Sequence, residues 1–220
     1  DLLGEGQRFE ESILSPLYAE SGTQFEADQL RALLDQRRVD TLIAPEDDIP
    51  NGVAPDRTWE DDAPTDADGE PNTWASSLET LLDQIKGVSA DGATRTVVCF
   101  QPSLAGDVGA WKVTGKADII VVRPSRPGTD ESGTVVDVLE VKASTNEQTH
   151  HRIQAACYTK LIKEALSSDP EAPTDVTVTA RVVHRGNAIS GGGYQSLQPF
   201  DLEPTEADIE LLLRANGRVD

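Results

Sequence analysis

The sequence has no methionine, only two cysteines and few aromatic residues. Cys99 and Cys157 form no CxxC pair, which argues against a zinc site. Two thiols also fall short of the four thiolates that hold an iron–sulfur cluster. We therefore expect two buried thiols and no iron–sulfur cluster.

Long apolar runs are absent as well. No run approaches the roughly 18 residues of a membrane-spanning helix, and no signal peptide precedes the acidic start. We therefore expect a cytoplasmic protein without a membrane partner. Because the chain begins with Asp1 and lacks methionine, we also expect it to be a piece of a longer protein.

Lysine is scarce: six lysines and thirteen arginines face 39 acidic residues, for a net charge of −20. An acidic surface that is poor in lysine and in large apolar groups is typical of a salt-loaded cytoplasm. A halophilic, haloarchaeal source is therefore our first interpretation, and an ordinary acidic protein is the alternative. Net charge bears on solubility and association, not on fold.

The chain is long enough for one domain with a hydrophobic core. Residues 45–72 stand apart, because they are rich in Pro, Asp and Gly and carry ten acids against Arg57, so 10 − 1 gives a local charge of −9. We expect a solvated, mobile loop insertion there. The prediction is a single domain over 1–220 that carries this insertion.

Apolar spacing predicts the regular elements. The expected helices are 5–20, ended or kinked by Pro16, then 24–38, 73–86 with Gly87 as its stop, 146–167, and one near 205–215. The expected strands are 95–101, 110–114, 117–123, 134–142, 175–184 and 192–199. The apolar run VVDVLEV indicates a strand that is buried on both faces. This order predicts an α/β or α+β fold around a mixed central sheet flanked by helices.

Two charged residues stand at the end of that apolar strand. Glu140 and Lys142 are two residues apart, so they point to the same face. Burial there would be costly unless each is paired or bound to something. For a triplet of this kind a salt-bridged pair at a strand end is by far the commoner explanation, so the triplet alone is weak evidence.

Asp118 opens the preceding strand, and consecutive strands usually pair. Asp118 and Glu140 are therefore expected to face each other across neighbouring strands. Two acidic side chains at so short a distance repel each other unless a cation lies between them. Hard oxygen ligands suit Mg²⁺ or Mn²⁺. A plain strand-edge carboxylate is the alternative for Asp118 alone.

The long helix carries a polar pair, Gln154 and Tyr158, on one face. These side chains could hold a phosphate or orient the strand with Glu140, or simply belong to an amphipathic helix. His151 lies one turn earlier on the same face. In the first helix, Glu10 follows Gly6 and adjoins an apolar residue, so we prefer it as a further carboxylate ligand, although a solvated helix face is the common alternative.

Taken in order, these motifs resemble the RecB-like branch of the PD-(D/E)XK nuclease superfamily. The family pattern is a first-helix G…E or G…H motif, then GxxD, then (D/E)xK on a strand, then QxxxY on the next helix. The sequence matches it over about 160 residues. The matching segments are Gly6…Glu10, Gly115…Asp118, Glu140-Val141-Lys142 and Gln154…Tyr158.

The resemblance implies a restriction-endonuclease-like core and a Mg²⁺- or Mn²⁺-dependent deoxyribonuclease that acts in DNA repair, recombination or defence. It implies that Asp118, Glu140 and Lys142 are catalytic. The metal would be bound by Asp118, Glu140, the Val141 carbonyl and Glu10. The substrate-binding candidates are Gln154, Tyr158, His151 and Lys116. With two cysteines, the chain resembles the cluster-free relatives.

DNA binding must be reconciled with the net charge. Residues 95–128 hold five basic and two acidic residues, and residues 142–163 hold four basic and one acidic, so each segment carries +3. Positive potential should therefore collect around the proposed site, and a helicase or other domain of the parent protein could add DNA affinity. The alternatives are a non-enzymatic DNA-end-binding or scaffolding module, and an acidic α/β protein with chance motif matches.

Overall fold

The structure is a computed structural model. It describes residues 15–35, 39–45, 53–59, 73–90, 95–108, 111–126, 133–190 and 193–212.

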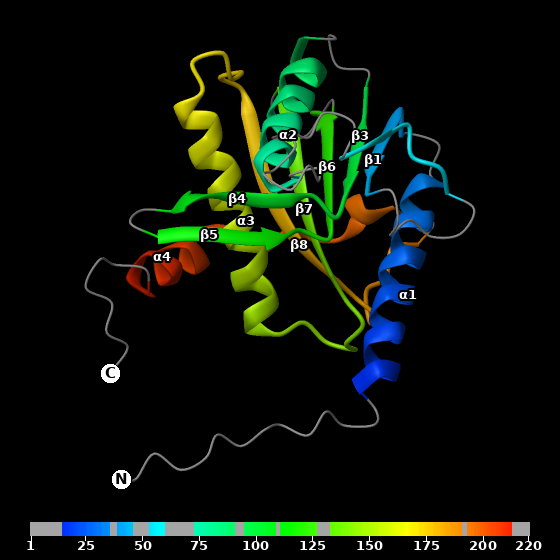
Figure 1. Ribbon diagram of the computed structural model, residues 1–220. Helices are drawn as coiled ribbons and strands as arrows, with labels where there is room; N and C mark the ends of the chain where they lie inside the picture. The colour runs from blue at the N-terminus through cyan, green and yellow to red at the C-terminus, as the bar shows by residue number, and fades with distance from the viewer. Residues whose placement is uncertain are drawn as a thin grey trace, which may run out of the picture.

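A six-stranded mixed sheet forms the centre of the molecule, in the order β2-β1-β3-β6-β7-β8 (Figure 1). β1 pairs in parallel with β2 and β3, β6 pairs antiparallel with β3 and β7, and β7 pairs in parallel with β8. The six strands are β1 (Thr41–Ala44), β2 (Arg57–Thr58), β3 (Val97–Phe100), β6 (Ile119–Pro124), β7 (Thr134–Lys142) and β8 (Val176–His184). The expected α/β class with a mixed central sheet flanked by helices is confirmed.

The remaining strands form a separate hairpin of β4 (Ser103–Val108) and β5 (Trp111–Lys116), which packs against the helices on one side of the sheet. Four α-helices and one 3-10 helix complete the described structure. They are α1 (Ser15–Leu34), α2 (Thr73–Ala90), α3 (Thr149–Ser168), the 3-10 helix η1 (Tyr194–Ser196) and α4 (Leu202–Leu212). Within the described ranges, no helix has both the length and the apolarity needed to cross a membrane.

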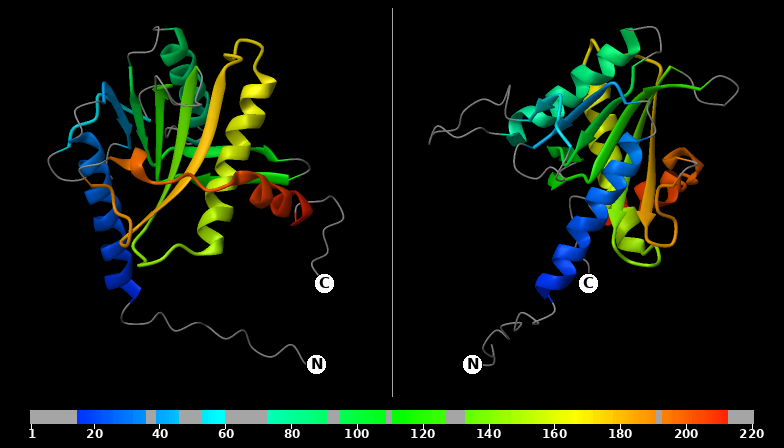
Figure 2. Two further views of the ribbon diagram at one scale, coloured as in Figure 1. Left: turned by 180° about the vertical axis from the view of Figure 1, so that it is seen from behind. Right: turned by 90° about the vertical axis from the view of Figure 1, so that its right-hand side faces the viewer.

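Each face of the sheet has its own hydrophobic core. One core joins α2, α3 and β4 to alternate residues of β7, namely Val136 and Val138. The other joins α1 and η1 to Leu139 and Val141. The alternation follows from the two-residue period of a strand, and it confirms the prediction that this strand is buried on both faces. The segment from η1 to α4 then crosses β8 toward α3 (Figure 2).

The helix boundaries differ from the predicted ones in two places. α1 runs unbroken from Ser15 to Leu34, where we predicted a break at Pro16 and a second helix over 24–38. Pro16 lies in the first turn of α1, where its missing N–H removes no hydrogen bond. α2 continues through Gly87 to Ala90 instead of stopping there. The rest of the predicted helix over 5–20, residues 5–14, lies outside the described residues.

The strand predictions were wrong at one segment and incomplete at others. Residues 194–196 form the 3-10 helix η1 instead of the strand predicted over 192–199. β1 and β4 were not predicted. The insertion over 45–72 contains β2, and Trp59 beside it is buried with its indole N–H donating to the Phe100 carbonyl at 2.9 Å. This part of the insertion is therefore attached to the sheet rather than solvated.

Candidate functional site

The site is built where β6 begins and β7 ends. The antiparallel register pairs Ile119 with Leu139. Continuing this register by one residue places Asp118 opposite Glu140, on the face that also carries Lys142. The structure therefore brings together the three side chains that the sequence predicted to be catalytic.

Lys142 is the centre of the cluster. Its Nζ lies 3.0 Å from Asp118 Oδ2 and 2.6 Å from Glu140 Oε1. The main-chain N–H of Val141 donates to the same Asp118 oxygen at 2.7 Å. Strand β7 thus holds Asp118 both through its backbone and through its terminal lysine.

The Glu140 carboxylate is in an unusual environment. Its side chain is completely buried, yet neither oxygen accepts a hydrogen bond from the described residues. Lys142 forms an ion pair with Oε1 at 2.6 Å, which leaves Oε2 without a polar partner among the described residues. A buried charge in this state is costly unless something further binds it. The unfilled acceptor capacity is the feature of the site that points to a cation.

The ionisation of the cluster follows from burial. Burial, and then the neighbouring Asp118 charge, raise the pKa of Glu140 to about 8. Burial also raises the pKa of Asp118, even though Lys142 and the Val141 amide act in the opposite direction. For Lys142, burial acts to lower the pKa, but the two acids outweigh it and the pKa is raised. The lysine therefore stays protonated at neutral pH while the acids hold protons more tightly than usual.

A third acid, Glu26 of α1, belongs to the same electrostatic cluster. Burial, and then the Asp118 charge, raise the pKa of Glu26 to about 7. Gln101 Nε2 donates to Glu26 Oε2 at 3.3 Å. Sequence reasoning chose Glu10 as the first-helix acid, and Glu10 lies outside the described residues. The signal for Glu26 was present, because the GxxFE pattern that ends at Glu10 recurs and ends at Glu26.

Gln101 connects Glu26 with Asp118. Its main-chain N–H donates to the Asp118 carbonyl at 2.9 Å, while its side chain reaches Glu26. Its φ of 49° is the only positive φ of a non-glycine residue in the described chain. A left-handed conformation strains a residue with a Cβ. The fold therefore maintains this strain at the position where α1 and the Asp118 turn meet.

The Gln154–Tyr158 pair supports the site from α3. Gln154 Nε2 lies 3.3 Å from Tyr158 Oη, and this hydroxyl donates to the Lys116 carbonyl at 2.7 Å. A Cβ added at Gly115 would lie 2.6 Å from the same hydroxyl. The glycine therefore allows the ring to approach the strand. The strand that this hydroxyl reaches is β5, which leads to Asp118, and not the Glu140 strand named in the prediction. The substrate-binding role of the pair stays a prediction.

His151 is buried at the start of α3. Its Nδ1 accepts a hydrogen bond from the Gln148 main-chain N–H at 3.3 Å, as part of a capping box. Burial, followed by the nearby His150 and Lys142, lowers its pKa. His151 therefore has a structural role at the start of α3. The substrate contact expected of it stays a prediction. Lys116 is exposed on β5, just before the Asp118 turn.

Comparisons with known proteins give no indication of the role of this site. No protein-family model, curated protein sequence or solved structure matches the chain.

Proposed function

We propose that this chain is a Mg²⁺- or Mn²⁺-dependent nuclease that hydrolyses DNA phosphodiester bonds on a RecB-like, restriction-endonuclease-like core. The observation that carries the proposal is the buried Glu140 carboxylate, whose oxygens lack hydrogen bonds from the described residues. Asp118 is held on the other side of the same ammonium group.

The charges of the cluster fit a divalent cation. Asp118 and Glu140 contact the single ammonium of Lys142, and Glu26 interacts electrostatically with Asp118 and Lys142, so ionisation of all three acids leaves two negative charges. Carboxylate oxygens are the ligands that Mg²⁺ and Mn²⁺ prefer. Among the described residues, no three acidic, histidine or cysteine side chains gather as a ready-made metal site. Asp118 and Glu140 would hold the ion, with Glu26 and the Val141 carbonyl as further candidates.

The roles of the side chains follow from their ionisation. A bound divalent ion would polarise the scissile phosphate and make the attacking water more acidic. Lys142 stays protonated because its pKa is raised, so it would donate hydrogen bonds to the water or to the phosphoryl oxygens instead of accepting a proton. Such a fixed charge typically contributes on the order of a hundredfold in rate. The Val141 amide donates a hydrogen bond to Asp118 Oδ2 and so holds this carboxylate beside Lys142.

The competing function is a non-enzymatic module that binds DNA ends or acts as a scaffold. The observation in its favour is that Lys142 contacts both acids and so neutralises them in part without any metal. In that case Lys142 and the two acids form a structural ion cluster. Removing one partner of such a cluster strongly destabilises the protein.

The test is Mg²⁺-dependent cleavage of labelled single- and double-stranded DNA by the wild type and by Lys142→Ala. Lys86→Ala is the matched control, since Lys86 also pairs with more than one acid: Asp169 at 2.7 Å, Glu171 at 3.8 Å and Asp83 at 3.9 Å. We expect cleavage by the wild type and the control, its suppression by a chelator, and its loss in Lys142→Ala while the protein stays folded. Full activity of Lys142→Ala would refute the assignment. DNA-end binding by the wild type without cleavage in either metal would favour the scaffold.

A further inference from the structure

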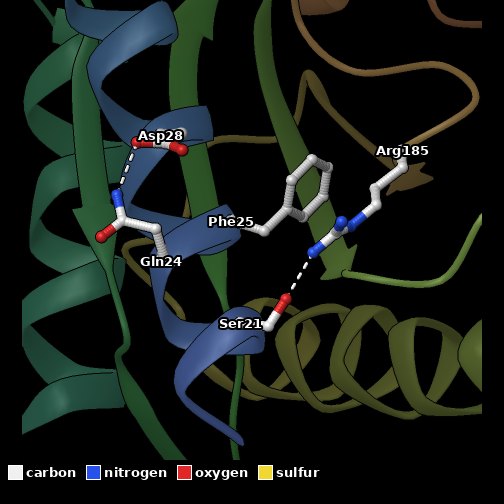
Figure 3. Close-up of a pocket in the computed structure, with 5 residues that line it drawn as sticks. All are labelled: Ser21, Gln24, Phe25, Asp28 and Arg185. Carbon is white, nitrogen blue, oxygen red and sulfur yellow. Dashed lines mark hydrogen bonds between the residues drawn. The ribbon is translucent and has the colours of Figure 1, made fainter. Parts of the chain in front are cut away.

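A pocket of about 310 Å³ lies against α1, the helix that also carries Glu26 (Figure 3). It is lined by Ser21, Gln24, Phe25, Asp28 and Arg185. The four α1 residues have the spacing of one helical stripe. Arg185 reaches this stripe from the turn after β8, so the pocket joins two elements that are far apart in the sequence.

Both walls of the pocket continue from elements that hold the candidate site. Phe25 directly precedes Glu26 on α1. Arg185 directly follows His184, which is the register partner of Lys142 in the β7–β8 pair. The Arg185 main-chain N–H also donates to the Ser144 carbonyl at 2.9 Å, two residues beyond Lys142. The pocket is therefore linked to the candidate site along α1 and through the turn after β8.

The groups in the pocket are those that recognise a nucleotide. The Arg185 guanidinium lies 5.8 Å from the centre of the Phe25 ring, and it donates to the Ser21 hydroxyl. An aromatic ring offers a stacking surface to any base, and arginine binds phosphate through several donors. Figure 3 shows Phe25, Ser21 and Arg185 side by side.

The one acid of the pocket is already engaged. Asp28 Oδ1 accepts hydrogen bonds from Gln24 Nε2 at 2.8 Å and from Arg31 at 3.1 Å. These contacts offset its repulsion of a phosphate. The charge that faces a ligand is then mainly that of Arg185.

We propose that this pocket binds one unpaired nucleotide next to the scissile phosphate, with its base against Phe25 and its phosphate at Arg185. The proposal rests on the proposed nuclease function and names its substrate as DNA with a single-stranded segment. A base within a duplex is stacked on its neighbours and paired, so it reaches such a ring only after unstacking, which costs a few kcal/mol.

The test is DNA binding by the full chain in the presence of a chelator, so that no cleavage takes place. The probe is a fluorescent oligothymidylate of about 15 nucleotides, within the site size of single-strand binders, compared with a duplex of the same length. We expect Phe25→Leu and Arg185→Gln each to weaken binding of the single strand by about tenfold, with a smaller effect on the duplex. Phe25→Trp should retain binding.

The matched control comes from a second arginine–phenylalanine contact. Arg152 lies 5.5 Å from the centre of the Phe200 ring, and neither residue lines the pocket, so Phe200→Leu should leave binding unchanged. An oligonucleotide without bases should bind the wild type more weakly and be insensitive to Phe25→Leu. Two results would contradict the proposed nucleotide pocket. One is an equal loss of affinity in the Phe200 and Phe25 variants, and the other is that Phe25→Leu weakens binding of base-free DNA as much as that of the normal strand. The binding assay contains no metal, so its outcome does not depend on cleavage. A wild type that binds the single strand through this pocket but cleaves no DNA would count only against the proposed nuclease function.

Discussion

The Tyr158 hydroxyl of α3 donates to the main-chain carbonyl of Lys116 at 2.7 Å, two residues before Asp118. A single hydrogen bond thus ties the long helix to the turn that presents the first acid of the site. Partners that orient the ligands of a metal typically affect affinity or activity by tenfold or more. Tyr158 is therefore best understood as a positioning residue.

We predict that Tyr158→Phe lowers Mg²⁺-dependent activity and apparent metal affinity by about tenfold, because the Asp118 turn loses its anchor. The free energy of unfolding should fall by about 1 kcal/mol, the usual contribution of one hydrogen bond. Metal titrations of the cleavage rate and denaturant unfolding measure the two effects.

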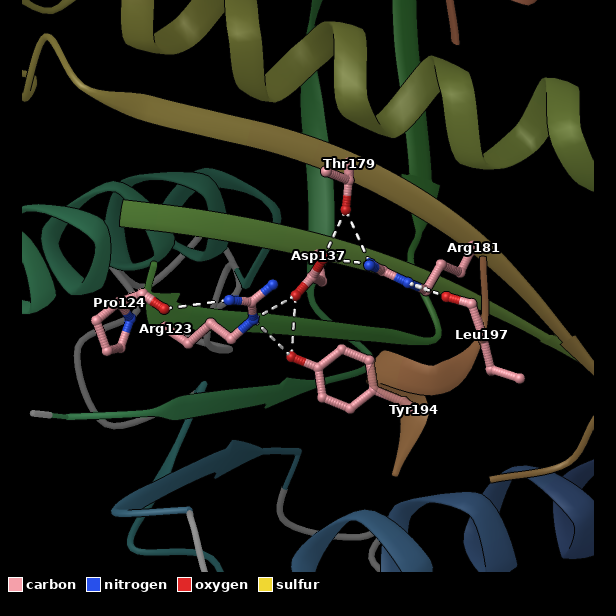
Figure 4. A network of polar contacts seen from close by, with 7 residues as sticks. All are labelled: Arg123, Pro124, Asp137, Thr179, Arg181, Tyr194 and Leu197. Carbon is pink, nitrogen blue, oxygen red and sulfur yellow. Dashed lines mark hydrogen bonds and ion pairs between the residues drawn. The ribbon is translucent and has the colours of Figure 1, made fainter. Parts of the chain in front are cut away.

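Tyr194→Phe is the matched control, because its hydroxyl belongs to a buried network on the other face of the sheet (Figure 4). That hydroxyl donates to Asp137 Oδ2 at 2.9 Å, and the same acid is paired with Arg123 and Arg181. The control should destabilise the protein while leaving metal dependence unchanged. An equal loss of metal affinity in both variants would show that Tyr158 acts only through stability.

Gly115→Ala should also impair the site. The added Cβ would lie 2.6 Å from Tyr158 Oη and 2.8 Å from its Cε1, so the ring must move and its bond to Lys116 is disturbed. We expect loss of activity and a free energy of unfolding lowered by about 1–3 kcal/mol, as for an overpacked core. Gly106→Ala in the same hairpin is the control, because its closest neighbour would be the end of the Leu161 side chain at 3.1 Å. Similar activity of the two variants would contradict this view of Gly115.

Much of the sheet and its acidic end could be predicted from local pattern. The apolar run over 134–142 indicated a buried strand, and the tendency of consecutive strands to pair placed Asp118 near Glu140. What could not be predicted depended on contacts distant in sequence. The GxxFE pattern occurs twice, and only the packing of α1 on the sheet brings Glu26 toward Asp118.

Other errors have the same origin. Tyr194 lies in a segment with strand-like composition, but its hydroxyl is used by Asp137, 57 residues earlier, and the backbone there forms a 3-10 turn. β2 is two residues long and lies in an acidic segment, so its composition predicts a loop. Its position is fixed by pairing with β1 and by the burial of Trp59, neither of which has a local signal.

The pKa of Glu140 predicts how stability depends on pH in the absence of metal. The pKa is about 8 in the folded protein against an ordinary value of 4.5, so the folded state binds this proton more tightly. Its contribution to stability is complete below about pH 4.5 and is lost as the pH rises through 8. Glu140→Gln should therefore raise the free energy of unfolding at pH 8 by a few kcal/mol and flatten its pH dependence.

Thermal and denaturant unfolding at several pH values, at constant salt and with a chelator, would measure this effect. Glu79→Gln, at an exposed position of α2, is the control for the change in net charge. Added Mg²⁺ should stabilise the wild type at pH 8 and leave Glu140→Gln unchanged, because only the wild type has the ligand. A Glu140→Gln variant that is less stable than the wild type at pH 8 would show that the carboxylate is satisfied as it stands.

Gln101 offers a test in which stability and function should move in opposite directions. Its φ of 49° is strained for glutamine and unstrained for glycine. We predict that Gln101→Gly keeps or raises the free energy of unfolding, by up to about 1 kcal/mol, since relief of strain offsets the lost bond to Glu26. Metal affinity should nevertheless fall, by about tenfold, because Glu26 loses its partner.

Gln101→Asn separates the two contributions of this residue, since asparagine tolerates the left-handed conformation but its shorter side chain falls short of Glu26. It should reproduce the loss of metal affinity without the gain in stability. Metal titrations of the cleavage rate and denaturant unfolding of both variants provide the measurement. If Gln101→Gly binds metal as well as the wild type does, then the Gln101 side chain is not needed to position Glu26. The strained backbone would then be required only by the turn before Asp118.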